Sequence, residues 1–171
     1  MPGTPLLTGL PPVAGARVRV LVLGSMPGAV SLEARRYYAH PRNLFWPLMG
    51  ALIGAGPELP YTARLARLQA RGLALWDVLQ HCRRRGSLDA AIRADTEVPN
   101  DFAAFFAAQP QLRAVFFNGR KAEQAFLRRV RPQLAAPLPA LVGLPSTSPA
   151  NAAVPAAEKL RRWRELLDWL P

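Results

Sequence analysis

The stretch YYAHPRNLFW, residues 37–46, combines aromatic rings with groups that form directional hydrogen bonds. Rings that border a pocket can stack on nucleobases, at roughly 1–3 kcal/mol per base. Tyr37 and Tyr38 are the better candidates for this, because the Phe–Trp pair that ends the stretch is expected to face the core. Asn43 offers a side-chain amide, which can either contact a ligand or cap a following helix. The stretch therefore indicates a site for a flat ligand.

A second candidate is GSMPG, residues 24–28, which follows an apolar run. Its glycines permit a ligand to approach the backbone closely, and successive N–H groups there could bind an anion. The stretch has neither the lysine of a phosphate-binding P-loop nor the third glycine of a dinucleotide-binding loop. A tight turn without a ligand explains it equally well.

A third candidate is LPSTSPAN, residues 144–151, with three hydroxyl groups and an amide. Such groups suit contacts with the phosphates on either side of a displaced nucleotide, and an ordinary turn is the alternative. Asp77 is either a functional carboxylate or a cap, and Asn118 is either a ligand contact or a turn residue. The three arginines at 83–85 are interpreted as a solvated cluster.

The elements that carry these residues alternate between strands and helices. Apolar runs predict strands at 17–24, within 73–79 (ending near Trp76–Asp77), at 112–119 and at 140–144. Other patterns predict helices at 43–56, 61–72, 101–109 (capped by Asp101) and 120–130, a short one from Ser87 or Leu88, and a final one with Leu160, Trp163, Leu166, Leu167 and Leu170 on one face. The alternation predicts a three-layer α/β/α fold around a central, mainly parallel four-stranded sheet. The loops after its strands meet at the carboxyl edge, where ligands bind in open α/β sheets.

The length of 171 residues suits one compact domain over the whole chain and is too short for two ordinary ones. Residues 1–16, rich in Pro and Gly, are expected to form an irregular leader. No apolar run reaches the roughly 18 residues that span a bilayer. The start also lacks the pattern of a secretory signal. We therefore expect a cytoplasmic protein with no membrane partner.

Residue types that bind metals are scarce in this chain. Cys82 is the single cysteine, and His40 and His81 are the two histidines. An internal disulfide and a four-cysteine iron–sulfur or zinc site are therefore excluded. We expect no metal and no cofactor.

The formal charge of +11 comes from 22 basic and 11 acidic residues, and every basic residue except Lys121 and Lys159 is an arginine. This balance favours a polyanionic partner such as nucleic acid, because the arginine fork matches phosphate oxygens. A composition bias is the alternative, since the chain is also rich in Ala, Pro and Leu. The charge does not indicate what is done to the partner.

The order and spacing of these stretches resemble the uracil-DNA glycosylase superfamily, over about residues 17–165. That family has a glycine–proline loop after its first strand and a proline–serine loop after its last. AHPRNLFW looks like the His-Pro-x-Asn-x-Phe-Trp segment of the mismatch-specific uracil and thymine glycosylases, and LPSTSPA looks like the Pro-Ser-Ser-Ser-Ala loop of the thymine branch. The whole combination, with LALWDVL, GSLDAAI and FFNG, is most similar to the deoxyinosine (hypoxanthine) DNA glycosylase branch.

Two positions depart from the pattern of the wider family. Relatives carry asparagine, aspartate or glutamate in the first loop to place the attacking water, and here that position is Met26. Many relatives begin the final loop with histidine or asparagine, and here that position is Leu144. The hypoxanthine branch is similar in this respect and is thought to depend on the asparagine of the aromatic segment. The resemblance therefore implies Asn43 as the catalytic residue.

The resemblance further implies a monomeric enzyme that flips a deaminated base, hypoxanthine first, out of double- or single-stranded DNA and hydrolyses its N-glycosidic bond. The alternatives are a uracil or mismatch-specific uracil/thymine glycosylase and a non-catalytic damaged-DNA-binding domain. Tyr38 would stack on the base, and Asp77 would accept its N1–H. The residues implied to contact the base are Gly24, Ser25, Met26, Pro27, Gly28, Tyr38, Phe45 (for which core packing is also favoured), Asp77 and Asn118. The residues implied to contact the DNA are Arg42, Ser146, Thr147, Ser148, Pro149, Ala150 and Asn151.

Overall fold

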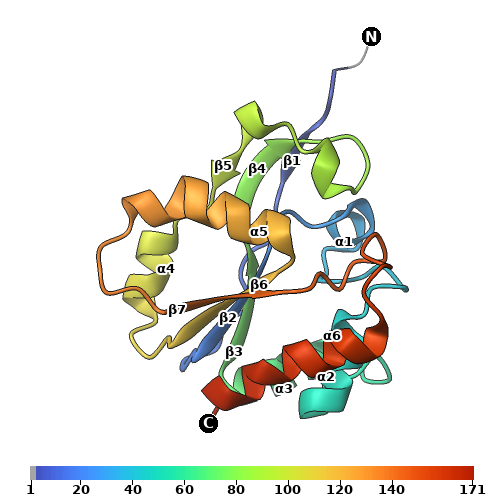
Figure 1. Ribbon diagram of the computed structural model, residues 1–171, viewed down its shortest axis with the longest axis vertical. Helices are drawn as coiled ribbons and strands as arrows, with labels where there is room; N and C mark the ends of the chain where they lie inside the picture. The colour runs from blue at the N-terminus through green and yellow to red at the C-terminus, as the bar shows by residue number, and fades with distance from the viewer. Residues whose placement is uncertain (1–2) are drawn as a thin grey trace.

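The computed structural model describes residues 3–171 and is built around a four-stranded parallel sheet (Figure 1). Its order is β3-β2-β6-β7, and each neighbouring pair runs parallel. The strands are β2 (Val20–Gly24), β3 (Leu73–Asp77), β6 (Ala114–Asn118) and β7 (Ala140–Leu144). Every residue of β2, β3 and β6 is buried, as expected for the apolar strands of a sheet covered on both faces.

Helices cover the two faces of this sheet as separate layers. Val20 and Val22 point into one layer and Leu21 and Leu23 into the other, because side chains alternate along a strand. The first layer holds α2 (Phe45–Ile53), α3 (Tyr61–Ala70) and α6 (Ala156–Trp163), and the second holds α4 (Phe102–Ala108) and α5 (Arg120–Ala125). The predicted three-layer α/β/α fold is confirmed.

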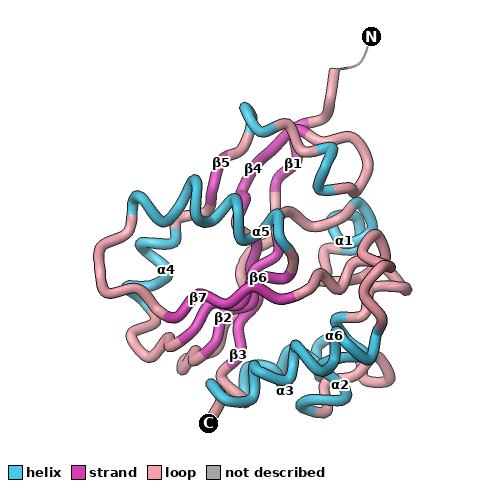
Figure 2. The backbone as a smooth tube through the Cα atoms, in the orientation of Figure 1, coloured by secondary structure: helices cyan, strands magenta, loops and turns pink. Residues whose placement is uncertain are grey.

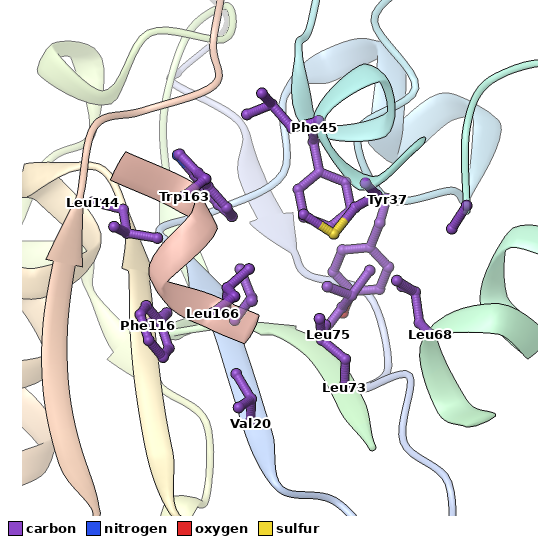
Figure 3. Close-up of a cluster of buried hydrophobic side chains, with 14 of the residues drawn as sticks. Val20, Tyr37, Phe45, Leu68, Leu73, Leu75, Phe116, Leu144, Trp163 and Leu166 are labelled. Atoms are coloured by element: carbon purple, nitrogen blue, oxygen red, sulfur yellow. The ribbon is translucent and has the colours of Figure 1, made fainter. Parts of the chain in front are cut away.

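The first layer is packed around aromatic rings from distant parts of the chain (Figure 3). Phe45 of α2 and Trp163 of α6 meet edge to face, with ring centroids 6.0 Å apart. The Trp163 indole N–H donates to the Pro145 carbonyl at 2.9 Å, which ties the last helix to the loop after β7. The aromatic core therefore holds two of the predicted loops in place.

A second, antiparallel sheet lies beside the first, as Figure 2 shows. Its order is β1-β4-β5, formed by β1 (Leu6–Thr8), β4 (Leu79–Arg83) and β5 (Val98–Pro99). The prediction of an irregular leader over residues 1–16 was wrong at Leu6–Thr8, which pair with β4. A three-residue strand among prolines and glycines carries too little pattern to be predicted. Residues 1–2 of the predicted leader lie outside the described residues.

The remaining elements are short. The helix expected from Ser87 or Leu88 is two 3₁₀ turns, Asp89–Ala91 and Ala94–Thr96, and α1 (Ala29–Ala34) was not predicted. The helix after β6 continues as a π-helical segment, Phe126–Val130, and a 3₁₀ turn, Arg131–Gln133, while α6 continues as a 3₁₀ helix, Arg164–Trp169. Asp101 caps α4 as predicted, because its Oδ1 accepts the Ala104 N–H at 3.0 Å. In the described part of the chain, we find no helix that is long and apolar enough to cross a membrane.

Candidate functional site

A cleft of about 1620 Å³ opens at the carboxyl edge of the parallel sheet. The loop after β2 (residues 24–28), the ends of β3 and β6, and the loop after β7 (residues 144–151) all line it. Part of the aromatic stretch closes another side, through Tyr38, Arg42 and Asn43. Every residue predicted for the site lines this cleft except Phe45. The topology therefore brings together segments that are more than a hundred residues apart in the chain.

Tyr38 presents a supported aromatic ring to the cleft. Its ring stacks on Phe45 at a centroid distance of 4.1 Å and an interplanar angle of 27°. Phe45 is fully buried and does not line the cleft, so its predicted contact with the base is wrong. It lies behind Tyr38 because it starts α2 and faces the core. The Tyr38 backbone is left-handed, with φ of 54°, a conformation that the surrounding packing must hold.

Tyr37 belongs to the scaffold rather than to the stacking surface. It is buried, and its hydroxyl donates to the Pro11 carbonyl at 2.8 Å. Its own carbonyl accepts the Trp46 indole N–H at 3.0 Å. Tyr37 also lines the cleft, but these bonds fasten it to the core and leave it 4% exposed, so Tyr38 is the better placed of the two tyrosines to stack on a ligand.

Asp77, the last residue of β3, is a buried carboxylate at the floor of the cleft. Among residues 3–171, neither its Oδ2 nor the Tyr38 hydroxyl has a hydrogen-bond partner that meets the usual distance and angle limits. A Cβ on Gly24 would lie 2.5 Å from Asp77 Oδ1 and 3.6 Å from the Tyr38 hydroxyl, so only glycine fits at that position. A buried carboxylate oxygen without a hydrogen-bond partner is costly to fold, so Asp77 keeps an unused acceptor in the cleft.

The charges around Asp77 set its protonation. Burial raises its pKa to about 7, with a further increase from the Asp89 carboxylate and a decrease from Arg84. Burial also raises the pKa of Tyr38, and the negative charge of Asp77 raises it further, so the phenol stays protonated. Because this pKa is close to neutral, small changes in pH near 7 convert Asp77 between a carboxylate, which only accepts hydrogen bonds, and a carboxylic acid, which can also donate one.

The first loop is held by side chains outside it. The Ser25 hydroxyl donates to Asp89 Oδ1 at 2.5 Å, which ties the loop to the 3₁₀ turn. The Arg84 guanidinium, 1% exposed, donates to the Met26 and Pro27 carbonyls. The prediction of a solvated arginine cluster at 83–85 is therefore wrong at Arg84. No local sequence signal distinguishes this arginine from its two neighbours.

Asn118 and Thr147 fasten the last loop to the sheet. Asn118 Oδ1 accepts the Thr147 N–H at 2.9 Å, and its side-chain NH₂ donates to the Thr147 hydroxyl at 3.0 Å. Thr147 is 1% exposed, and its carbonyl accepts the Leu44 N–H at 3.0 Å. This pair explains how the loop reaches the aromatic stretch, and it places the Thr147 hydroxyl in the interior rather than on the surface.

The other two hydroxyls of the last loop are more open. Ser146 Oγ accepts the Ser148 N–H at 3.1 Å, and Ser148 Oγ accepts the Ala150 N–H at 3.2 Å. In the described part of the chain, these two hydroxyls act only as acceptors, so each O–H remains available as a donor. The Asn151 amide donates to the Ser146 carbonyl at 3.2 Å and closes the turn. The loop therefore presents two fixed donors to the cleft.

Asn43 lies at the start of α2 and also at the cleft. Its Oδ1 accepts the N–H of Phe45, the first residue of α2, at 2.9 Å and so caps this N–H from one residue before the N-cap position, which is Leu44. The side chain also lines the cleft. The cap fixes the plane of the amide and leaves one lone pair of Oδ1 for a further partner.

Positive charge surrounds the opening of the cleft. Arg42, which was predicted, and Arg120 and Arg162, which were not, are exposed and line it. Lys121 also lines the cleft, but its ammonium pairs with the buried Glu97 carboxylate. Among residues 3–171, no three His, Cys, Asp or Glu side chains come together as metal ligands.

The geometry defines a class of protein: a parallel α/β protein with a cleft at the carboxyl edge of its sheet, lined by a tyrosine ring, a buried carboxyl group, hydroxyl groups and exposed arginines. Comparison with known protein families identifies the class more closely. The family model of the uracil DNA glycosylase superfamily matches residues 11–169. The chain belongs to that superfamily.

Two relatives and one solved structure agree with this membership. The chain is 40% identical over 114 residues to the hypoxanthine DNA glycosylase of Methanosarcina barkeri, covering 66% of this chain and 71% of the relative. It is 39% identical over 115 residues to the hypoxanthine DNA glycosylase of Methanosarcina acetivorans, covering 67% and 72%. The solution NMR structure of a candidate uracil DNA glycosylase from M. acetivorans superposes with a TM-score of 0.77 at 32% identity, covering 95% of this chain and 99% of that one.

Proposed function

We propose that this protein is a DNA glycosylase that flips hypoxanthine out of DNA and hydrolyses its N-glycosidic bond to leave an abasic site. The observation that carries the proposal is the buried, unpartnered Oδ2 of Asp77 in a cleft beside the Tyr38 ring. The similarity to two hypoxanthine DNA glycosylases supports the choice of base. A glycosylase must extrude its target because the reacting bond cannot be reached inside the duplex.

The edge of hypoxanthine complements the floor of the cleft. The base presents the N1–H donor next to the O6 acceptor, and the ionised Asp77 carboxylate is an acceptor only. Adenine presents a bare N1 lone pair at that place, which a carboxylate repels. If adenine bound here, the buried Asp77 acceptor would have no donor, and the complex would be less stable. This contact therefore discriminates between hypoxanthine and adenine more strongly than a difference in shape alone would.

The chemistry depends on where charge develops. As the bond from N9 to C1′ breaks, its electron pair stays on the base and the sugar becomes an oxocarbenium ion. Backbone N–H groups of the first loop can donate to the oxygen on which the negative charge collects, and such preorganised donors are a large source of catalysis. A water then adds to C1′, and its proton passes to the departing base anion, directly or through solvent water, so that neutral hypoxanthine and an abasic sugar are released. The free lone pair of Asn43 Oδ1 can orient that water, while its amide is too weak a base to deprotonate it.

The DNA backbone is bound by the opening of the cleft. Ser146 and Ser148 donate to the phosphates beside the extruded nucleotide, and Arg42, Arg120 and Arg162 neutralise phosphates around it. Pro149 or Ala150 fills the vacated place in the stack. We propose that a monomer acts in this way on double- or single-stranded DNA, since one chain supplies the whole cleft. Binding should weaken steeply as salt increases, as for other proteins that neutralise several phosphates.

The stacking role of Tyr38 gives a first prediction. Tyr38→Ala should weaken binding to DNA that carries an uncleavable deoxyinosine analogue roughly 5- to 100-fold, because one base–aromatic stack is lost. Tyr38→Phe is the matched control: it keeps the ring and should retain most of the affinity that Tyr38→Ala loses, because the stack depends on the ring and not on the hydroxyl. Fluorescence anisotropy measures both affinities. Equal affinity of Tyr38→Ala and the wild type would exclude the stack.

A panel of substrates tests the proposed function itself. Labelled oligonucleotides with one hypoxanthine, xanthine, uracil or adenine are incubated with excess enzyme and then cleaved with alkali at abasic sites. We expect release of hypoxanthine and none of adenine. Uracil and xanthine present the same carbonyl beside an N–H, so their release would indicate a broader glycosylase of deaminated bases. Cleavage at uracil alone would replace the proposal with a uracil glycosylase, and binding without cleavage would replace it with a damaged-DNA-binding domain.

A further inference from the structure

Arg84 is an arginine buried against the first loop of the cleft. It directly follows β4, is 1% exposed, and belongs to none of the segments predicted to form the site. Its Nε donates to the Gly86 carbonyl at 2.8 Å, one terminal nitrogen to the Pro27 carbonyl at 2.7 Å, and the other to the Met26 carbonyl at 3.4 Å. The planar guanidinium thus binds three backbone oxygens at fixed angles, which a flexible ammonium cannot do.

The bond to the Pro27 carbonyl determines which way the Pro27–Gly28 peptide group of the first loop faces. In a trans peptide the C=O and the N–H point in opposite directions. Because the Pro27 carbonyl is turned to Arg84, the N–H of Gly28 is turned away from it. The Ser25 carbonyl accepts the Leu79 N–H at 3.0 Å, so the N–H of Met26 is likewise turned away from the strands. Among the described residues, the N–H groups of Met26 and Gly28 have no hydrogen-bond partner, and both residues line the cleft.

We propose that Arg84 is a positioning residue that aims the Gly28 N–H group at the departing base, beside the Met26 N–H that the Leu79 bond orients, and that it supplies positive charge to the surroundings of Asp77. This inference rests on the proposed function and extends it to a residue that touches neither base nor DNA. One guanidinium thus has two effects: its hydrogen bonds hold the first loop, and its positive charge acts on the nearby Asp77 carboxylate.

The charges around Asp77 give the inference an electrostatic consequence. Burial and Asp89 raise the pKa of Asp77, and Arg84 lowers it. Tyr38 and Tyr37 are the other titratable groups that interact with Asp77, and burial raises the pKa of both, so they stay neutral. Burial also lowers the pKa of Arg84, but an arginine starts high enough to remain charged. Removing the charge of Arg84 therefore shifts the ionisation of Asp77 to higher pH.

Two variants separate the geometry from the charge. Arg84→Lys keeps a cation but loses the fork, and Arg84→Gln keeps an amide donor but loses the charge. We expect single-turnover release of hypoxanthine to fall roughly 10- to 100-fold in both, since small displacements of catalytic donors have effects of this size. In Arg84→Gln the acid limb of the pH–rate profile should also move to higher pH. Arg83→Lys is the matched control, because Arg83 is exposed and donates to the Thr4 carbonyl away from the cleft, and it should react as the wild type does.

The outcomes separate this inference from a merely structural role and from the proposed function. Thermal unfolding shows whether each variant is folded at the assay temperature. Folded variants with wild-type rates and an unmoved acid limb would overturn the inference. If the wild type releases no hypoxanthine, the proposed function fails, and the inference is then decided by an NMR titration of the Asp77 carboxyl carbon. A higher pKa of Asp77 in Arg84→Gln than in the wild type supports the electrostatic link, and an equal pKa contradicts it.

Discussion

Replacing Asp77 by asparagine should slow hypoxanthine release roughly 10- to 100-fold at pH 8, the loss expected when one hydrogen bond to a charged group is removed. The pH dependence should change as well. The pKa of Asp77 is about 7, so the wild-type rate should rise as the pH increases through 7 and the carboxylate becomes able to accept the N1–H. The variant has no carboxylate at this place, and its rate should be nearly independent of pH there. Single-turnover rates between pH 5 and 9 measure both effects.

The same substitution should make the protein more stable at alkaline pH. Because the folded state raises the pKa of Asp77 above its ordinary value, the folded protein binds more protons than the unfolded chain between about pH 4 and 7. The stability that a neutral Asp77 provides is therefore present below pH 4 and is lost as the pH rises through 7. Asparagine carries no charge at any pH, so the variant does not lose this stability. The free energy of unfolding of Asp77→Asn should exceed that of the wild type by about 2–4 kcal/mol at pH 8 and should differ little from it at pH 4.

Asp77→Asn should therefore lose activity and gain stability, a trade-off that is common at functional sites. Denaturant unfolding at pH 4 and pH 8 measures the change in stability. Asp101→Asn is the matched control, because Asp101 caps α4 on the other face of the sheet and asparagine caps equally well. A stable Asp77→Asn enzyme with wild-type rates at every pH would mean that Asp77 does not contact the base.

Replacing Asn43 gives the second large effect. Asn43→Ala should reduce single-turnover base release roughly 100-fold, comparable to the loss of one preorganised catalytic group. It should also destabilise the protein by about 1 kcal/mol, because the Phe45 N–H loses its cap. The two losses have different origins and can be measured apart.

Asn43→Ser separates the catalytic role of Asn43 from its structural role. A serine hydroxyl can accept the Phe45 N–H and restore the cap, so the variant should unfold as the wild type does. It lacks the amide carbonyl that faces the water, and we expect its rate to stay close to that of Asn43→Ala. If the serine variant releases hypoxanthine at the wild-type rate, Asn43 serves only to start α2.

The parallel sheet and its edge could be predicted because buried strands leave a strong signal. The apolar runs that end at Gly24, Asp77, Asn118 and Leu144 gave the four strands. Since parallel strands end at one edge, they also gave the approximate place of the cleft. The three-residue β1 and the polar β4 have no such signal, and the second sheet was missed for that reason.

The roles of individual side chains were harder to predict, because they depend on direction rather than on residue type. Phe45 and Tyr38 are both aromatic and close in the chain, yet one supports the other from behind. Thr147 stands between two serines, but only its hydroxyl is bound by Asn118. Arg84 differs from its neighbours only in facing inward at the end of β4. Such distinctions arise from tertiary packing, which local sequence does not record.

The position of the base in a complex tests the central claim most directly. A duplex with 2′-fluoro-2′-deoxyinosine is suitable, because the fluorine disfavours the oxocarbenium ion and preserves the glycosidic bond. In the structure of that complex, we predict the hypoxanthine ring outside the helix and against Tyr38, with N1–H on Asp77 Oδ2 and O6 toward the N–H groups of Met26 and Gly28. A base that remains stacked in the duplex, or one extruded to a place remote from Tyr38 and Asp77, would contradict the account.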